Sequence, residues 1–294
     1  MSGDPLVHRL GRLLTRVLLA PGLRNIPGAQ ALYTRLYLLG KTLAEPRERR
    51  FLREQVELGM VVFDVGANVG FYTLLLADRV GPEGRVHAFE PDPLSFEILK
   101  SRAAGHSNIE INQTAVGDHA GTITLYTNRS NRADNRVHPS LGSETAEAVE
   151  VPLTTLDDYC AARGIERIDA VKMDIQGAEV AALKGFRKTV DRLKPRWMLI
   201  EFSPEHLRGA GSSPEAFWGI LGEMGYEPWG FEEDGKVFRI ADTAVFTRRF
   251  EDGYTDVWAK SSAAFQTASD ERLDPATQGD ALGAAPRSWP AMRP

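Results

Sequence analysis

The chain has 294 residues, a net charge of −5 and 43% hydrophobic residues, values that are ordinary for a globular protein. The acidic balance argues against a dedicated nucleic-acid binder, because such domains are normally basic. A single cysteine, Cys160, excludes an internal disulfide framework and a cysteine-rich zinc site, and it favours a reducing, cytoplasmic location.

The first 50 residues predict a basic, amphipathic helical arm. Arg9, Arg12 and Arg16 lie at helical spacing opposite a leucine-rich face. They interrupt the apolar stretch, which leaves neither a signal-peptide core nor the roughly 20 apolar residues of a membrane span. We expect this arm to pack against its own domain or against a homodimer partner, and attachment to a membrane surface is the alternative.

Residues 51–250 are predicted to form one α/β domain. Apolar runs predict strands at 60–65, 84–90, 109–116, 121–128, 148–156, 169–175, 196–202, 226–231 and 243–249. Helical periodicity predicts helices at 70–80, 92–104, 177–193 and 214–225. Strand–helix alternation at this interval implies a parallel sheet that is covered by helices on both faces.

Two further segments are set apart by composition. Strands 121–128 and 148–156 are expected to pair antiparallel around a polar segment, 129–143. Residues 251–294 are expected to be a C-terminal extension, disordered from about residue 261, because Ala, Ser, Gly, Asp and Pro dominate there.

Acidic side chains end four of the predicted strands: Asp64, Glu90, Asp174 and Glu201. In an open α/β sheet, ligands bind beyond the carboxyl ends of the strands. One such acid is commonly the cap of the next helix, but four along one edge favour a binding site.

The stretch VVFDVGANVGFYT, residues 61–73, predicts a cofactor-binding loop. Gly66 permits a positive φ or the close approach of a ligand, and Gly70 permits close packing where the next helix begins. The free N–H groups of that helix suit an anionic group. Glu90 follows at about the 20-residue distance at which an acid accepts hydrogen bonds from ribose hydroxyls.

The loop spacing is G-x-x-x-G, which differs from the G-x-G-x-x-G of dinucleotide sites. Asp64, directly before the loop, would repel a phosphate and attract a cation. A nucleoside that carries an ammonium and a sulfonium group suits this acidic loop, and we therefore predict S-adenosylmethionine as the cofactor.

An ordered set of segments resembles the FkbM-type methyltransferases, which are class I S-adenosylmethionine-dependent enzymes. The segments are VVFDVGANVGFYTLLLA, VHAFEPDPLSFEILK, NQTAVGD, VPLTTLDDY, IDAVKMDIQGAEVAALKGF and LIEF. They span roughly Phe51 to Arg249, and the order F-E-P-D, A-V-G-D, K-x-D-x-x-G-A-E is specific. The resemblance implies a Rossmann-like class I methyltransferase fold, with a mostly parallel seven-stranded sheet and helices on both faces.

The resemblance also implies roles for individual residues. The residues implied at the methionine part of the cofactor are Asp64, Gly66, Asn68 and Gly70. Those implied at the ribose and adenine are Glu90, Pro91, Ala115 and Val116. Asp174 falls close to the methyl group and the substrate. Gln176 departs from the family pattern, which usually has Glu there, and this puts a base or metal role at that position in doubt. Glu179 matches the pattern, but it also suits the first turn of a helix, so both interpretations stay open.

Methyl transfer to a hydroxyl group is helped by a base that takes its proton. Asp174 is the first candidate for this base, and His206, just beyond the last parallel strand, is the second. A solvent-exposed loop histidine is an equal alternative for His206. No metal site is expected, because the acids lack metal-ligand spacing and no histidine cluster accompanies them.

The polar segment 129–143 contains Arg132, Asn135 and Arg136. We expect these residues to bind a sugar or another polyol from a flap that closes over the site. An ordinary solvated hairpin loop is the alternative.

The sequence therefore predicts an O-methyltransferase whose partner is a small molecule or glycan with a free hydroxyl, such as a sugar, glycolipid or secondary metabolite. Three alternatives stay open: a methyltransferase for nitrogen acceptors, a non-catalytic cofactor-binding scaffold, and a nicotinamide-dependent oxidoreductase. The missing G-x-G-x-x-G argues against the last of these.

Overall fold

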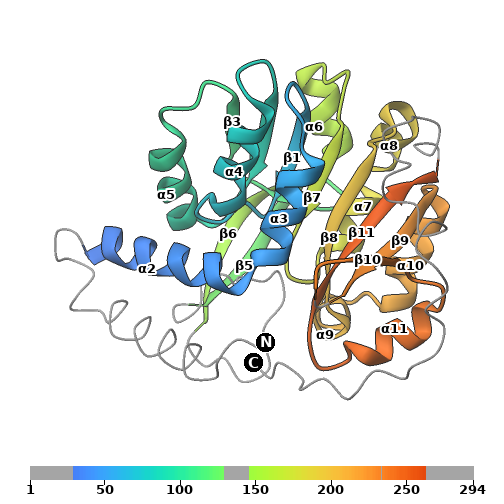
Figure 1. The fold of residues 1–294 in the computed structure, drawn as a ribbon. Coiled ribbons are helices and arrows are strands. Elements are labelled where there is room, and N and C mark those ends of the chain that lie inside the picture. Colours follow the sequence, from blue (N-terminus) through green and yellow to red (C-terminus); the bar gives the residue numbers. More distant parts are fainter. Residues whose placement is uncertain (1–28, 129–145, 233, 263–294) are drawn as a thin grey trace.

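The computed structural model describes residues 29–128, 146–232 and 234–262. Its main sheet has eight strands in the order β10-β9-β11-β8-β7-β1-β2-β3, and a smaller sheet has the order β4-β6-β5 (Figure 1). The strands are β1 Val61–Val65, β2 Arg85–Phe89, β3 Ile109–Asn112, β4 Ala115–Val116, β5 Gly121–Asn128, β6 Ala146–Thr154, β7 Ala170–Met173, β8 Trp197–Phe202, β9 Tyr226–Phe231, β10 Val237–Arg239 and β11 Thr255–Ser261.

Helices separate most of these strands along the chain. They are α2 Ala29–Ala44, α3 Pro46–Gln55, α4 Phe71–Val80, α5 Pro93–Ala103, α6 Leu156–Arg163, α7 Glu179–Lys184, α8 Arg187–Leu193, α9 Pro204–Gly209, α10 Pro214–Glu223 and α11 Thr243–Arg249. Among these described helices, none is both long and apolar enough to cross a membrane.

Strands β8, β7, β1, β2 and β3 are parallel neighbours, and β11 pairs antiparallel with β8 and β9. The predicted α/β class with a mostly parallel sheet is confirmed. The main sheet has eight strands instead of seven, because the short hairpin strand β10 extends its edge by pairing with β9. The predicted antiparallel pair is also confirmed as β5 and β6.

Three predicted elements are wrong. The strand expected at 109–116 divides into β3 in the main sheet and β4 in the smaller sheet. The helix expected at 177–193 divides into α7 and α8. The strand expected at 243–249 is the helix α11, which begins where Asp242 Oδ1 accepts a 2.9 Å hydrogen bond from the Val245 amide, as helix N-caps do.

The closing strand of the sheet is β11, which lies between β8 and β9. The expected domain boundary at residue 250 falls before this strand, so the sheet continues as far as Ser261. The expected extension beyond residue 262 and the arm up to residue 28 lie outside the described residues.

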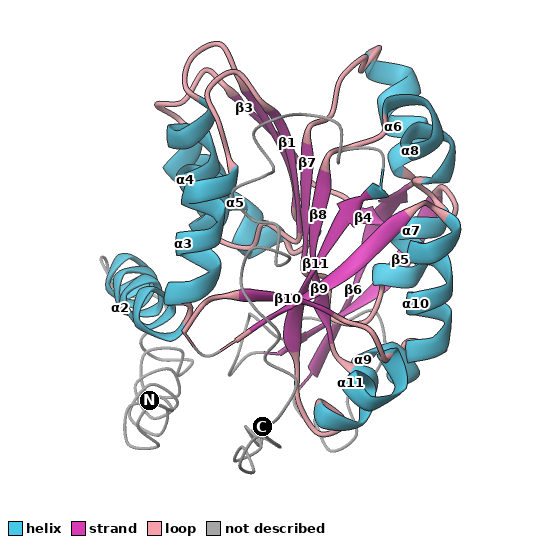
Figure 2. Ribbon diagram, turned by 45° about the vertical axis from the view of Figure 1, so that its right-hand side comes forward, coloured by secondary structure: helices cyan, strands magenta, loops and turns pink. Residues whose placement is uncertain are grey.

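The two main apolar clusters lie one on each face of the main sheet. Helices lie on both sides of this sheet (Figure 2). On one face, Phe51 and Leu52 of α3 and Leu76 of α4 pack against Val62 of β1. On the other face, side chains from α6, α7 and α10 cover the strands. Because successive side chains of a strand alternate between faces, β1, β2, β7 and β8 each contribute to both clusters.

The alternation places several charged residues on the face that α3 and α4 cover. Asp64 shares this face with Val62, and Lys172 shares it with Ala170. Asp64 and Lys172 are also register partners on the parallel strands β1 and β7. Glu201 and Asp256 are register partners on β8 and β11. A row of charged groups therefore crosses the sheet next to its carboxyl edge.

Candidate active site

The loop between β1 and α4 follows the carboxyl end of β1 and contains the two glycines of the sequence motif. Gly66 has φ 87° and Gly70 has φ 81°, a left-handed conformation that favours glycine. A Cβ atom on Gly66 would lie 1.9 Å from the Asp174 carbonyl oxygen, and one on Gly70 would lie 2.6 Å from Leu99 Cδ1. Gly66 thus permits the loops after β1 and β7 to meet, and Gly70 permits α4 to begin against α5.

Glu90 ties this loop to the end of β2. Its Oε2 atom accepts a 2.7 Å hydrogen bond from the Asn68 amide, and its Oε1 atom accepts a 2.8 Å bond from the Asp92 amide. Burial, opposed by these hydrogen bonds and reinforced by the charge of Asp92, raises the pKa of Glu90 to about 8. Each carboxylate oxygen keeps a further lone pair for a ligand hydroxyl, as the ribose prediction requires.

Asp64 lies behind the loop and is fully buried. Its Oδ2 atom accepts a 2.6 Å hydrogen bond from the Thr73 hydroxyl in the first turns of α4. Its Oδ1 atom accepts no hydrogen bond from any described residue and lies 3.9 Å from Lys172 Nζ. Burial raises the pKa of Asp64, although the Lys172 charge opposes this shift.

Asp174, directly after β7, is the centre of the polar cluster. Its Oδ2 atom lies 3.4 Å from Lys172 Nζ, and its Oδ1 atom accepts a 2.9 Å hydrogen bond from Gln176 Nε2. Burial opposes ionisation, but the charges of Lys172 and Lys41 lower the pKa of Asp174 below its usual value. Its side chain keeps 24% of its surface exposed, so a ligand can reach the carboxylate.

Gln176 and Glu201 extend this cluster toward β8. The amide of Gln176 also donates a 2.7 Å hydrogen bond to Glu201 Oε2, so that one amide group bridges two acids. Burial and the nearby charge of Asp174 raise the pKa of Glu201 well above its usual value. The departure from the family pattern at residue 176 thus supplies a donor between two carboxyl groups.

His206 is not an exposed loop residue, because α9 places it beside the cluster with only 12% of its side chain exposed. Its Nδ1 atom lies 3.8 Å from Glu201 Oε2. The structure therefore brings both candidate bases, Asp174 and His206, to the same acid, Glu201.

Glu179 has a structural position at the start of α7. Its carboxylate accepts hydrogen bonds from the amides of Ile175, at 3.1 Å, and Gly177, at 2.9 Å. It is almost fully buried, and burial together with the charge of Glu201 raises its pKa to about 8. Both carboxylate oxygens therefore face the backbone of the loop after β7.

The residues predicted for the adenine end follow β2 and form β4 of the smaller sheet. Pro91 is half-buried directly after Glu90, whereas Ala115 and Val116 form β4 and are buried. Val116 packs into the core beneath α6 and α7, and Ala115 packs against β5 and β6. Arg132, Asn135 and Arg136 lie outside the described residues.

Sequence reasoning missed the cations and the tyrosine of this site. Lys172 is 4% exposed, and its Nζ atom lies 5.2 Å from the centre of the Tyr72 ring. Lys41 of α2 lies 5.2 Å from the same ring, and the Tyr72 hydroxyl donates a 2.5 Å hydrogen bond to Glu45. A lysine inside the buried strand AVKM was the available signal, because unpaired lysines are rarely buried.

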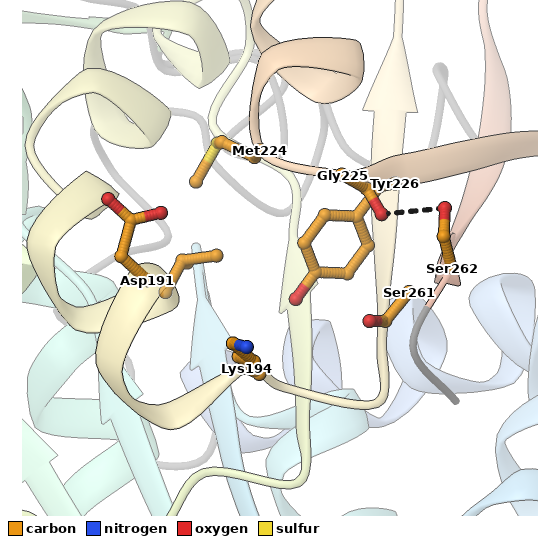
Figure 3. A pocket seen from close by; sticks show the side chains of 8 residues that line it. Asp191, Lys194, Met224, Gly225, Tyr226, Ser261 and Ser262 are labelled. Carbon is orange, nitrogen blue, oxygen red and sulfur yellow. Dashed lines mark hydrogen bonds between the residues drawn. The ribbon is translucent and has the colours of Figure 1, made fainter. Parts of the chain in front are cut away.

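A separate pocket lies at the opposite edge of the sheet, where β8 begins and β11 ends (Figure 3). Asp191 and Lys194 are the charged residues among those that line it, and the Ser262 hydroxyl donates a 2.9 Å hydrogen bond to the Gly225 carbonyl. Of the predicted site residues that the structure describes, none lines this pocket.

A family model matches the middle of the chain. The model of the methyltransferase FkbM domain matches residues 64–228. The 31-O-demethyl-FK506 methyltransferase FkbM of Streptomyces tacrolimicus is 31% identical over 193 residues, which cover 55% of this chain and 70% of that protein. The 2-O-methyltransferase NoeI of Sinorhizobium fredii is 24% identical, covering 50% of this chain and 65% of that protein. The hexuronic acid methyltransferase AglP of Haloferax volcanii is 23% identical, covering 72% and 84%.

Solved structures of methyltransferases resemble the chain more distantly. A SAM-dependent methyltransferase from Aquifex aeolicus has a TM-score of 0.40 and 16% identity, covering 72% of this chain and 88% of that one. A SAM-dependent O-methyltransferase from Thermotoga maritima has a TM-score of 0.39 and 13% identity, covering 76% and 71%.

The family match begins at Asp64 and includes the glycine loop, Glu90, Asp174 and Glu201. It covers more than half of the chain, and the matched region runs from the end of β1 through the parallel strands β2, β3, β7 and β8. The chain therefore belongs to the FkbM methyltransferase family and is an S-adenosylmethionine-dependent methyltransferase.

Proposed function

We propose that this enzyme is an O-methyltransferase that acts on a hydroxyl group of a sugar, glycolipid or secondary metabolite. The observation that carries the proposal is the position of Asp174, a partly exposed carboxylate directly after β7, whose backbone meets the glycine loop at Gly66 and whose Oδ2 atom lies 3.4 Å from Lys172 Nζ. An ionised carboxylate at this position suits the removal of a hydroxyl proton. The names of the relatives support the same choice, since they include a 2-O-methyltransferase and a hexuronic acid methyltransferase.

The residues present fit S-adenosylmethionine. Glu90 supplies buried carboxylate oxygens beside the glycine loop, where ribose hydroxyls would donate to them. Asp64 lies buried behind this loop, with one oxygen that accepts no hydrogen bond from the described residues and lies 3.9 Å from Lys172 Nζ. We place the methionine part at the loop of Gly66, Asn68 and Gly70. The adenine part belongs near Pro91, Ala115 and Val116.

When bound, S-adenosylmethionine supplies a methyl group on a positively charged sulfur. The protein has to align the acceptor oxygen with that methyl carbon and keep water away. We assign Asp174 as the base: its carboxylate would take the proton of the acceptor hydroxyl, so that the oxygen could accept the methyl group that the bound cofactor would supply. His206, beside Glu201, is the second candidate for this proton. Arg132, Asn135 and Arg136 remain predicted contacts for the acceptor.

A methyl-transfer screen tests this proposal. The full chain is incubated with radiolabelled S-adenosylmethionine and with matched acceptors that carry either a hydroxyl or an amine at the same position of a sugar or polyketide scaffold. We expect label on the hydroxyl series, and Asp174→Asn should lower turnover by about 10² to 10⁴-fold, the usual contribution of a general base, with cofactor affinity preserved. Transfer to the amines alone would replace the proposal with a nitrogen acceptor, and cofactor binding without any transfer would favour a scaffold.

A further inference from the structure

Lys172 carries a positive charge at the centre of the sheet. Its side chain is 4% exposed, on the parallel strand β7 between β1 and β8. Its Nζ atom lies 3.4 Å from Asp174 Oδ2 and 3.9 Å from Asp64 Oδ1. A buried lysine loses its proton unless carboxylates compensate for its lost hydration. Here the two acids have that effect, and the pKa of Lys172 is raised despite its burial.

The pairing of β1 with β7 places Lys172 beside these two acids. Asp64 and Lys172 are register partners on β1 and β7. The Asp174 amide donates a 3.0 Å hydrogen bond to the Val65 carbonyl, so the pairing continues for one step past the end of β7. The Tyr72 ring then lies 5.2 Å from Lys172 Nζ, at a distance that favours a cation over an aromatic face. The Lys172 ammonium group is therefore surrounded by the carboxylates of Asp64 and Asp174 and by the Tyr72 ring.

We propose that Lys172 is a positioning residue: its ammonium group keeps the Asp174 carboxylate ionised and fixed at the methyl-transfer end of the sheet. This inference rests on the role of Asp174 in the proposed function. Lys172 itself does not touch the reacting atoms, and its effect reaches the acceptor hydroxyl through Asp174.

The groups around Asp174 explain why the charge of Lys172 matters for its ionisation. The titratable groups that interact electrostatically with it are Tyr37 and Lys41 from α2, Asp64 from β1, Lys172 from β7, Glu201 from β8, and Tyr254 and Asp256 at the start of β11. Acids predominate in this set, and burial further disfavours their charged forms. Lys172 and Lys41 are the cations that oppose this tendency at Asp174, and Lys172 is the nearer partner by hydrogen bonding.

The proposal predicts that replacement of Lys172 changes the titration of Asp174. The chain is labelled with ¹³C at aspartate Cγ, and the Asp174 signal is assigned by its loss in Asp174→Asn. In the wild type we expect this carboxylate to stay ionised from pH 5 to pH 8. In Lys172→Met its titration midpoint should move up by at least one pH unit, whereas Lys172→Arg should keep the carboxylate ionised because arginine stays charged.

Lys260→Met is the matched control. Lys260 is also a buried lysine above an aromatic ring, with its Nζ atom 5.5 Å from the centre of the Trp258 ring. It pairs with Trp197 at the opposite edge of the sheet, so this variant should leave the Asp174 signal unchanged. An equal shift in Lys260→Met and Lys172→Met would overturn the proposal, because it would reveal a general loss of packing.

The pH profile of turnover gives a second readout. With a hydroxyl acceptor, the acid side of the turnover profile should move to higher pH in Lys172→Met by the same amount as the Asp174 midpoint, while Lys172→Arg should keep the wild-type profile. If no hydroxyl acceptor is methylated, the proposed function fails, but the aspartate titration still decides the role of Lys172. If Lys172→Met does not fold, the titration of the wild-type protein still tests the proposal. An Asp174 midpoint above pH 5 in the wild type would refute it.

Discussion

The Asn68 amide donates a 2.7 Å hydrogen bond to Glu90 Oε2, across 22 residues of sequence. This bond links the loop after β1 to the end of β2, and it is made while Asn68 holds a left-handed φ of 49°. The residue proposed to hold the ribose therefore also fixes the shape of the loop proposed to hold the methionine part. One side chain would therefore serve both halves of the proposed cofactor site.

Replacement of Glu90 by alanine is expected to abolish measurable binding of S-adenosylmethionine. The variant removes the acceptor for the ribose hydroxyls and also leaves the Asn68 and Asp92 amides without their carboxylate. A hydrogen bond to a charged group contributes about 1.5–3 kcal/mol, and each 1.4 kcal/mol of lost binding free energy weakens binding about tenfold. Titration calorimetry measures this loss. Glu97→Ala, on the exposed surface of α5, should bind normally, and near-normal affinity in Glu90→Ala would contradict the ribose placement.

Replacement of Gly66 by alanine is expected to destabilise the fold by several kcal/mol. Two costs add: the positive φ, about 1–2 kcal/mol for a side-chain-bearing residue, and the contact of the new Cβ with the Asp174 carbonyl at 1.9 Å. Gly59→Ala separates these costs, because Gly59 has φ 77° and no atom lies within 4 Å of the position that its Cβ would take. Urea unfolding measures both variants. Equal losses in free energy of unfolding would show that the loops after β1 and β7 do not meet at Gly66.

The strands, the parallel sheet and the acid-rich edge were predictable from sequence because each has a local pattern. The runs VVFDV and RVHAF alternate or stay apolar over a full strand, and Asp64 and Glu90 mark where those strands end. The closing strands were not predictable in the same way. TAVFTRR has the composition of a strand, but the Asp242 cap begins a helix there, and the true closing strand β11 was assigned to the extension.

The cations of the site were missed for a physical reason. Some partners of these lysines are brought together only by the fold: Asp64 in the case of Lys172, and the Tyr72 ring in the case of Lys41. Sequence reasoning found the acids because they share a position at strand ends. It gave Lys172 no role, although the K-x-D motif contains it, because no spacing rule connects a lysine inside one strand with an acid at the end of its neighbour.

Replacement of Glu179 by glutamine is expected to flatten the dependence of stability on pH. The pKa of Glu179 is about 8 in the folded chain and near 4.5 without the fold, so the folded state binds the proton more tightly. This contribution to stability is complete below about pH 4.5 and is lost as the pH rises through 8. Urea unfolding from pH 5 to pH 8.5 should show a shallower decline in Glu179→Gln than in the wild type.

The exposed Glu205→Gln variant of α9 controls for the loss of one negative charge, and its decline should match that of the wild type. Part of the slope should persist in Glu179→Gln, because Glu90 also has a pKa of about 8 in the folded chain. Parallel curves for Glu179→Gln and the wild type would contradict the burial of Glu179 as an acid against the backbone of Ile175 and Gly177.

Replacement of Gln176 by glutamate, the residue usual in the family, is expected to destabilise this chain at neutral pH. Gln176 Nε2 donates to Asp174 Oδ1 at 2.9 Å and to Glu201 Oε2 at 2.7 Å. An ionised glutamate cannot donate, so both acids lose their partner and gain a like charge, at a cost of about 1–3 kcal/mol for each buried group left unsatisfied. The loss should shrink toward pH 5, because a protonated glutamate regains one donor.

Urea unfolding of Gln176→Glu at pH 7 and pH 5 measures this difference, with Gln113→Glu on the exposed surface as the control for added charge. If the two variants unfold alike at both pH values, the amide bridge between Asp174 and Glu201 does not form. A loss of stability confined to Gln176→Glu at pH 7 would support the neutral amide bridge between Asp174 and Glu201. Because Gln176 adds no negative charge, Lys172 then has one carboxylate fewer to neutralise than it would with glutamate at this position, and it remains the nearest cation to Asp174.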